Sequence, residues 1–314
     1  FSSRRRHTRY ISVTGVQTCA LPILGLAARR FEALLPRRLI AILRLMPGRV
    51  PSPSATENPQ VFSAQGPRRK RVALLTGCVQ QALAPAINEA TVRLLTRHGC
   101  DVVIAPGAGC CGAVTHHLGK DALPWAKANV DAWTRAAAAG LDAVVVNASG
   151  CGTMVKDYGF LLRNDPDYAD RAERVSALAK DVSELMLELG LKEPVIAMGQ
   201  RVAYQSPCSM QHGQKVASEP KTLLAKAGFE VLDIPEGHLC CGSAGTYNLL
   251  QPSLATRLRD RKVENIASLH PDIVASGNIG CMMQIGSAMT VPIVHTVELL
   301  DWATGGIKPD ALRR

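Results

Sequence analysis

Residues 71–78 read RVALLTGC, and residues 201–208 read RVAYQSPC. The cysteine pair and glycine at 110–112 return at 240–242, and Gly150-Cys151 returns as Gly280-Cys281. Each of these pairs is 130 residues apart, and within each copy 32 residues separate the first cysteine from the pair and 40 separate the pair from the last. Eight of the ten cysteines follow this register, which indicates an internal duplication.

Short apolar runs lead into the cysteine positions of both copies. We expect strands at 72–75, 101–104, 143–146, 201–205, 230–234, 272–275 and 292–295. Between them, helices are expected at about 85–97 and 121–138. The alternation predicts an α/β fold with two tandem pseudo-symmetric repeats, each a mostly parallel sheet flanked by helices. Because ligands bind beyond the carboxyl ends of such strands, three loops can bring four thiols into one pocket in each copy.

The charge is concentrated at the start of the chain. The net charge is +10, but residues 1–70 hold 13 Lys/Arg and 2 Asp/Glu, which leaves the rest close to neutral. The remaining sequence has no basic stripe interleaved with aromatic residues, so we do not expect it to bind nucleic acid. Ten cysteines in a chain of 314 residues favour metal or redox chemistry in a reducing compartment. No apolar run approaches the roughly 20 residues of a membrane span.

The first 70 residues differ in character from the repeats. Residues 1–23 resemble a translated sequencing-library adapter, in which case Cys19 carries no meaning; a transit peptide is the alternative. Residues 24–46 have the spacing of one or two short basic amphipathic helices, which either pack on their own domain or dock on a partner subunit or a membrane face. Residues 47–70 are expected to be a linker. The two predicted repeat domains then span 71–195 and 196–314.

Each copy supplies four soft thiolate ligands, which suit iron–sulfur clusters and zinc. Adjacent cysteines cannot easily point at one tetrahedral ion, whereas they can reach different irons of a cluster, so the pattern favours a cluster over zinc. The candidate metal- and cofactor-binding residues are the first thiol set, Cys78, Cys110, Cys111 and Cys151, and the second thiol set, Cys208, Cys240, Cys241 and Cys281.

Other polar and cysteine positions are assigned structural roles. Cys100 lies outside the register, with Phe229 in the matching place, and is expected in the core. The histidines near the cysteines favour packing or surface roles over sulfur hydrogen bonds or proton relay; they are His116, His117, His212 and His238. His295 with Glu298, and Asp181 with Glu184, are expected to cap helices in both copies. No catalytic residue is predicted, because no nucleophile–base pair, phosphate loop or dinucleotide fingerprint is present.

Three motifs carry a resemblance to a known family. Residues 204–214 (YQSPCSMQHGQ), 240–248 (CCGSAGTYN) and 277–281 (GNIGC) resemble the cysteine-rich CCG domains of the glycolate oxidase iron–sulfur subunit. The cysteine-rich subunits of heterodisulfide reductase and of anaerobic glycerol-3-phosphate dehydrogenase share this domain, as does a lactate-utilisation protein.

The resemblance implies an electron-transfer subunit of a glycolate oxidase (glycolate dehydrogenase) complex, which is not catalytic on its own. It would pass electrons from flavin-containing partner subunits towards a quinone or another acceptor. It implies a [4Fe–4S] cluster in one or both sites, a cytoplasmic location and peripheral contact with the inner face of the plasma membrane.

Two departures from the family pattern leave alternatives open. Ala148 and Asn278 stand where family members with the full pattern have a fifth cysteine. With four cysteines in each copy, three arrangements stay open: an ordinary cubane cluster, zinc in one site, or one site without metal. The family's amino-terminal ferredoxin domain is missing, since only Cys19 precedes Cys78, and we expect that domain to be lost or separate. The rival functions are a zinc-stapled scaffold subunit and a disulfide reductase similar to the cysteine-rich subunit of heterodisulfide reductase.

Overall fold

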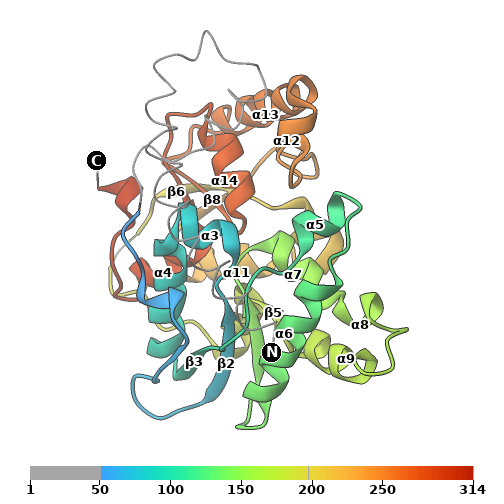
Figure 1. Cartoon of the computed structure of the whole chain (residues 1–314). Helices are drawn as coiled ribbons and strands as arrows, with labels where there is room; N and C mark the ends of the chain where they lie inside the picture. Colours follow the sequence, from blue (N-terminus) through green and yellow to red (C-terminus); the bar gives the residue numbers. More distant parts are fainter. Residues whose placement is uncertain (1–50, 197, 314) are drawn as a thin grey trace.

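Two sheets correspond to the two copies of the repeat in a computed structural model of the chain, which describes residues 51–196 and 198–313 (Figure 1). One sheet has the order β1-β3-β2-β4-β5, and the other has the order β7-β6-β8-β9. All pairings are parallel except that of β1 with β3. The strands are β1 (Gln60–Phe62), β2 (Lys70–Leu75), β3 (Cys100–Ile104), β4 (Ala143–Val146), β5 (Ala179–Asp181), β6 (Arg201–Gln205), β7 (Glu230–Asp233), β8 (Ile273–Ser276) and β9 (Ile293–His295).

The order β3-β2-β4-β5 is the same arrangement as β7-β6-β8-β9. In both copies the chain moves from its central strand to one side and then crosses to the other. The register is also repeated, because Val72 lies opposite Ala143 and Val202 lies opposite Ile273. The strand order therefore reverses between β2 and β4 and again between β6 and β8, the places where open parallel sheets bind ligands. This confirms the predicted fold class.

Helices connect the strands and cover the sheets. As predicted, α4 begins with Pro85 at its first position and ends at Arg97 before Gly99, and α6 fills the second expected helical region. The first copy contains α3 (Cys78–Leu83), α4 (Pro85–Arg97), α5 (Ala113–His117), α6 (Leu123–Ala137), α7 (Ser149–Lys156), α8 (Tyr158–Leu161), α9 (Ala169–Leu178) and α10 (Val182–Leu189). The second contains the π-helix η3 (Ser209–Gln214), α11 (Glu219–Lys226), α12 (Tyr247–Leu250), α13 (Pro252–Ala267), α14 (Ile279–Gly286) and α15 (Thr296–Ala303). Short 3₁₀ turns are η2 (Ala55–Glu57) and η4 (Asp310–Leu312).

One hydrophobic core is shared by the two sheets. Val72 on β2 and Val202 on β6 belong to the same buried cluster, which also contains residues of α4, α10, α11 and α15. Ala73, the neighbour of Val72, points to a separate core on the other face of its sheet, as alternation along a strand requires. Ala203 likewise faces a third core in the second copy. The helices of the shared core therefore form a layer that joins the two copies.

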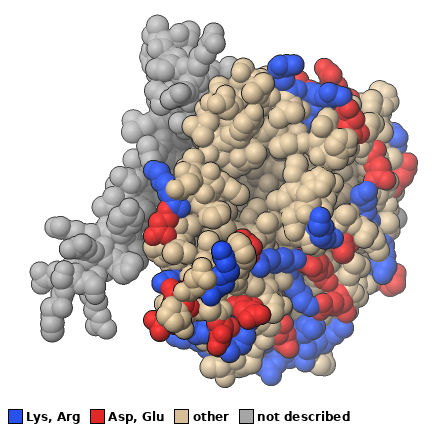
Figure 2. Space-filling view, turned by 90° about the vertical axis from the view of Figure 1, so that its right-hand side faces the viewer, with Lys and Arg blue, Asp and Glu red and all other residues tan. Residues whose placement is uncertain are grey.

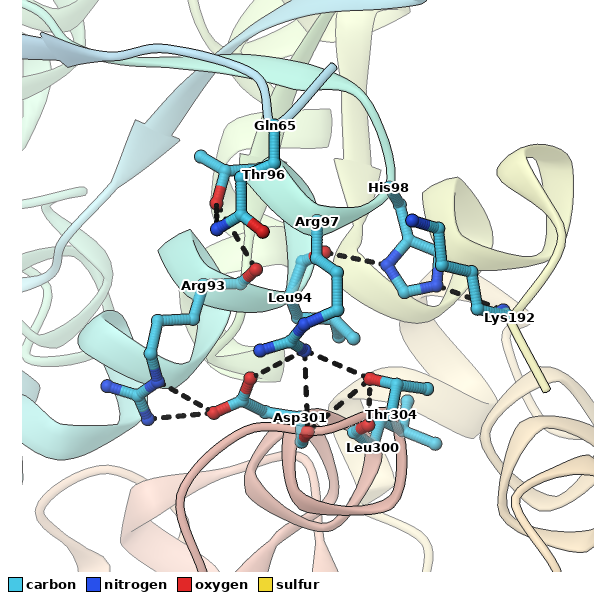
Figure 3. A network of polar contacts seen from close by, with 10 residues as sticks. All are labelled: Gln65, Arg93, Leu94, Thr96, Arg97, His98, Lys192, Leu300, Asp301 and Thr304. Atoms are coloured by element: carbon cyan, nitrogen blue, oxygen red, sulfur yellow. Dashed lines mark hydrogen bonds and ion pairs between the residues drawn. The ribbon is translucent and has the colours of Figure 1, made fainter. Parts of the chain in front are cut away.

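A buried ion-pair network strengthens this junction (Figure 3). The carboxylate of Asp301 on α15 is fully buried and receives hydrogen bonds from Arg93, at 2.8 Å, and Arg97, at 2.9 Å, both on α4. Thr304 accepts a further hydrogen bond from Arg97 at 3.0 Å. Because a buried carboxylate is costly unless it is paired, this contact favours one specific docking of α15 on α4.

The region before β2 differs from expectation. The prediction that residues 47–70 form a linker is wrong for Gln60–Phe62, which pair with β3 as an antiparallel edge strand. Three residues surrounded by Pro, Ser and Gly carry too weak a local signal, and their pairing is decided by the exposed edge of β3. The predicted segment 1–23, the expected helix at 24–46 and Cys19 lie outside the described residues. Within the described ranges, no helix combines the length and apolar character of a membrane span.

Candidate metal centres

The first thiol set is assembled by three segments that follow parallel strands. Cys78 is the first residue of α3 after β2, and Cys151 lies in the first turn of α7 after β4. Cys110 and Cys111 lie in the loop between β3 and α5. Because β2 and β4 flank the point where the strand order reverses, their carboxyl ends bring Cys78 and Cys151 to the same edge of the sheet.

The four thiols of this set form a row. Cys78 donates a hydrogen bond to the sulfur of Cys110 at 3.5 Å. Cys110 interacts in turn with Cys111, and Cys111 with Cys151. The structure therefore brings together all four cysteines that the sequence assigned to this set.

The second thiol set repeats the arrangement. Cys208 lies between β6 and η3, and Cys281 lies in the first turn of α14 after β8. Cys240 interacts with both Cys208 and Cys241, and Cys241 interacts with Cys281. Cys100, which belongs to neither set, is fully buried in β3, as predicted.

Backbone amides at the cysteine pairs point at sulfur atoms. The amide of Gly112 donates to Cys110 Sγ at 3.4 Å, and that of Gly242 donates to Cys240 Sγ at 3.3 Å. Both glycines have positive φ, at 84° and 87°, a backbone conformation that other residues adopt only with strain. The glycine after each pair is thus required for the turn that directs these amides.

Hydrogen bonds between the thiols shift the pKa values within each set in opposite directions. Hydrogen bonds from neighbouring thiols lower the pKa of Cys110 to about 2 and that of Cys240 to about 2. Hydrogen bonds with Cys110 raise the pKa of Cys78 and that of the buried Cys111 far above the ordinary thiol value. The pKa of Cys281 is lowered as well, by its hydrogen bond with Cys241. Ionisation of all four thiols of a set would require a compensating cation.

The thiols do not surround a single point. Each hydrogen-bonds with its neighbours in the order 78, 110, 111, 151 or 208, 240, 241, 281. Across residues 51–196 and 198–313, no three His, Cys, Asp or Glu side chains are grouped like the ligands of one metal ion. The donor set and its extended arrangement fit a centre with several metal atoms better than one tetrahedral ion.

The two thiol sets are neighbours across the junction of α7 and η3. The hydroxyls of Ser149 and Ser209 are hydrogen-bonded at 2.8 Å, and Thr153 donates to the carbonyl of Ser209 at 3.0 Å. A Cβ at position 152 would lie 2.7 Å from Gln214 Nε2, so a residue larger than Gly152 would displace the side chain of Gln214. Ser149 is two residues from Cys151, and Ser209 follows Cys208, which connects the two sets through one hydrogen bond.

The surroundings of the second set contain two polar groups that sequence reasoning missed. Lys262 on α13 is 1% exposed and its charge acts on thiols of this set. The side-chain amide of Asn278 donates to Cys281 Sγ at 3.4 Å. The repeat offset assigns Ala132 and Ala148 to these places in the first copy. The alignment of Lys262 with Ala132, a residue of the core in the first copy, is the one sequence feature that could have indicated that Lys262 is buried.

The histidines have the structural roles expected from the sequence. His295 is buried and caps α15, accepting from the amide of Val297 at 3.1 Å, while Glu298 accepts from the amide of His295. Asp181 and Glu184 form the same capping box on α10. In the described part of the chain, no histidine is hydrogen-bonded to a cysteine sulfur.

The side of the molecule that carries α5 and α12 is poor in charge. Figure 2 shows a hollowed, uncharged area on this side, with lysine, arginine and acidic residues gathered towards its edges. Several large apolar side chains near the first thiol set are exposed. They are Val79, Val114, Leu118, Leu123 and Trp125, followed by Leu250 and Leu254 in the second copy.

Comparison with known proteins places the sequence repeat in a defined family. The family model described as a cysteine-rich domain, CCG, matches residues 72–156 and again 202–286. A glycolate oxidase iron–sulfur subunit of Escherichia coli is 44% identical over 237 residues, which cover 75% of this chain and 58% of that protein. A probable glycolate oxidase iron–sulfur subunit of Bacillus subtilis is 32% identical, over 86% of this chain and 63% of that protein.

Shorter and more distant relatives align with the same region. Lactate utilization protein A of Geobacillus thermodenitrificans is 28% identical over 74% of this chain and 98% of its own length. A solved structure of a hypothetical protein from Helicobacter pylori has 12% identity and a TM-score of 0.55, covering 80% of this chain and 51% of that chain, a likeness of fold alone. The chain spans about three fifths of the length of the two glycolate oxidase subunits it matches.

Proposed function

The chain belongs to the family of proteins with cysteine-rich CCG domains, and on that premise we propose that it is an iron–sulfur electron-transfer subunit of a glycolate oxidase (glycolate dehydrogenase) complex. The observation that carries the proposal is the convergence of four thiols at the same sheet position in each copy. Two relatives named as glycolate oxidase iron–sulfur subunits support the assignment to this oxidoreductase class.

The eight thiols are proposed as the ligands of iron–sulfur clusters of the [4Fe–4S] type. Their softness and number match such clusters, and the amides of Gly112 and Gly242 would stabilise sulfur charge as the cluster is reduced. When bound, the clusters would supply one-electron transfer. The protein contributes thiolates and directed amides.

The contact between α7 and η3 supports transfer from one set to the other. The segments that carry Cys151 and Cys208 are joined by the Ser149–Ser209 hydrogen bond. Electrons would arrive from a flavin-containing partner subunit, directly or through a ferredoxin domain, and leave towards a quinone or another acceptor. The partner would oxidise the 2-hydroxy acid.

The uncharged side near the first thiol set is suited to contact with such a partner. Its exposed apolar side chains include Val114 on α5, three residues after Cys111, and Trp125 on α6, whose Cβ would lie 3.2 Å from a Cβ at position 112. Apolar surface of this kind is typical of subunit interfaces. We place the complex in the cytoplasm, at the inner face of the plasma membrane, following the resemblance to membrane-associated glycolate dehydrogenase.

Metal analysis of the full chain tests the proposal. After anaerobic reconstitution, we expect about four irons and four sulfides per filled set, about eight of each for both, with visible absorption that decreases on reduction. A variant with serine at all eight positions is the control and should bind no cluster. Protein that holds only zinc and shows no reducible chromophore would overturn the electron-transfer role in favour of a zinc-stapled scaffold. Turnover of a thiol disulfide by the loaded protein would instead support the disulfide-reductase alternative.

A further inference from the structure

Lys262 is a lysine in the interior of the second copy. It lies in the middle of α13 and is 1% exposed, although lysine is among the residues least often buried. Its ammonium donates to the backbone carbonyls of Glu236, at 3.1 Å, and Gly237, at 3.4 Å. Both carbonyls belong to the loop that leads into Cys240 and Cys241. The lysine is therefore held beside the second thiol set.

The charge of Lys262 is matched by the thiols. Burial lowers the pKa of this ammonium, and the negative charges of the second thiol set oppose that decrease. The cation and the thiolates thus stabilise each other in a region of low dielectric constant, where charge interactions are strong.

A purely structural role is the simpler alternative. Two other side chains of α13, those of Arg261 and Asn265, also hold the loop, through the side chain of Glu236 and the carbonyl of Pro235. In the first copy a neutral residue is sufficient, since Asn129 binds the amide of Gly109 and the carbonyl of Cys110. Anchoring the loop therefore does not require a buried charge, and position 132, aligned with Lys262, is alanine.

We propose that Lys262 is a positioning residue that gives the second thiol set a higher reduction potential than the first, so that electrons pass from the first set to the second. This inference rests on the proposed function. A fixed cation near a cluster stabilises the additional negative charge that the cluster gains on reduction. The amide of Asn278, which faces Cys281, acts in the same direction. The first set has alanine at both corresponding positions.

The test compares substitutions that separate charge from hydrogen bonding. Lys262→Gln keeps hydrogen-bond donors for the two carbonyls but removes the charge, and Lys262→Arg keeps the charge. A cavity of about 230 Å³ borders Lys262 and leaves room for the larger guanidinium. Lys221→Gln is the matched control, because Lys221 lines the same cavity but lies nearer the surface, paired with Asp233.

The reconstituted full chain is titrated anaerobically with electron paramagnetic resonance detection, and iron is counted in each variant. Cys110→Ser identifies the step that belongs to the first set. We expect two steps in the wild type, with the second set reduced first. Lys262→Gln should move only the second set to lower potential, whereas Lys262→Arg and Lys221→Gln should leave both steps in place.

The other possible results of the titration distinguish a charge effect of Lys262 from a structural one. Unchanged potentials in Lys262→Gln, equal shifts of both steps, or the same shift in Lys221→Gln would overturn the inference while leaving the cluster assignment intact. If Lys262→Gln loses iron only from the second set, retention of that iron by Lys262→Arg supports the charge role, and its loss there shows a structural role. A wild type without reducible iron would overturn both the inference and the proposed function.

Discussion

The two copies carry the same thiol pattern on the same strand order, but they differ in what surrounds it. In the first copy Cys78 is exposed and apolar side chains such as Trp125 face the solvent nearby. In the second copy Cys208 is partly covered, Cys281 is buried, and Lys262 and Asn278 add positive and polar groups. The strand order and cysteine positions that both copies share therefore determine where a centre can form. The neighbouring residues that differ between the copies determine how exposed that centre is and which charges lie beside it.

The largest effect is expected when one thiol set is broken at a time. Cys110→Ser and Cys240→Ser each remove a central member of one row, so each variant should lose about four irons and keep the other centre. Iron and sulfide analysis, with the electron paramagnetic resonance signal of the remaining centre, measures this. Loss of both centres in either variant would show that the copies do not load independently.

The glycines after the cysteine pairs provide a second comparison. Gly112→Ala and Gly242→Ala both force alanine into positive φ, which costs about 1 kcal/mol. A Cβ at position 242 would also overlap the backbone carbonyl of Ala255, whereas at position 112 it would lie 3.2 Å from the Cβ of Trp125. Since the backbone cannot move aside easily, Gly242→Ala should destabilise the chain by roughly 3 kcal/mol or more and Gly112→Ala by about 1–2 kcal/mol. Urea unfolding measures both, and equal losses would contradict this difference between the loops.

The helix caps of α10 and α15 should respond to acid with opposite signs. Burial lowers the pKa of His295 to about 4 and raises that of Asp181 to about 6. Below about pH 6.5 the unfolded chain binds a proton at His295 that the folded chain does not, so acid destabilises the fold through this residue. At Asp181 the folded chain binds the proton first, so stability is lost instead as pH rises through about 6.

Two neutral substitutions separate these contributions. From about pH 7 to about pH 5, the stability of His295→Asn relative to wild type should rise by about 2 kcal/mol, and that of Asp181→Asn should fall by about 1 kcal/mol. Urea unfolding of the full chain at both pH values gives the numbers needed. Parallel slopes for wild type and both variants would mean that neither cap titrates as its burial requires.

The smallest effect concerns the residue three positions before the last cysteine of each copy. Asn278→Ala removes the amide that donates to Cys281 and should lower the potential of the second centre by an amount on the order of 1 kcal/mol, some tens of millivolts. Ala148→Asn offers the first copy the same donor towards Cys151 and should raise the potential of its centre. Redox titration of the two variants measures both shifts. A change of the opposite sign in either variant would contradict the role of the Asn278 amide in raising the potential of the second centre.

Much of this molecule could be predicted from the sequence because its main signals are local or repeated at one fixed spacing. Apolar runs at fixed distances before Cys78 and Cys208 predicted the strands β2 and β6, and the repeat register predicted which thiols converge. Asp181 and His295 each stand three residues before a glutamate, so their capping boxes could be expected. Such features depend on a few neighbouring residues or on the order of strands in a parallel sheet.

Only the tertiary structure decided the features that depend on contacts between distant segments. Gln60–Phe62 form a strand because β3 offers an open edge, and Ser149 meets Ser209 because α7 packs on η3. The neighbours of Lys262 in the chain do not indicate its burial, which results from the position of the loop before Cys240. The spacing of residues along the chain determined which thiols gather, but the packing of one element on another determined which charges lie beside them.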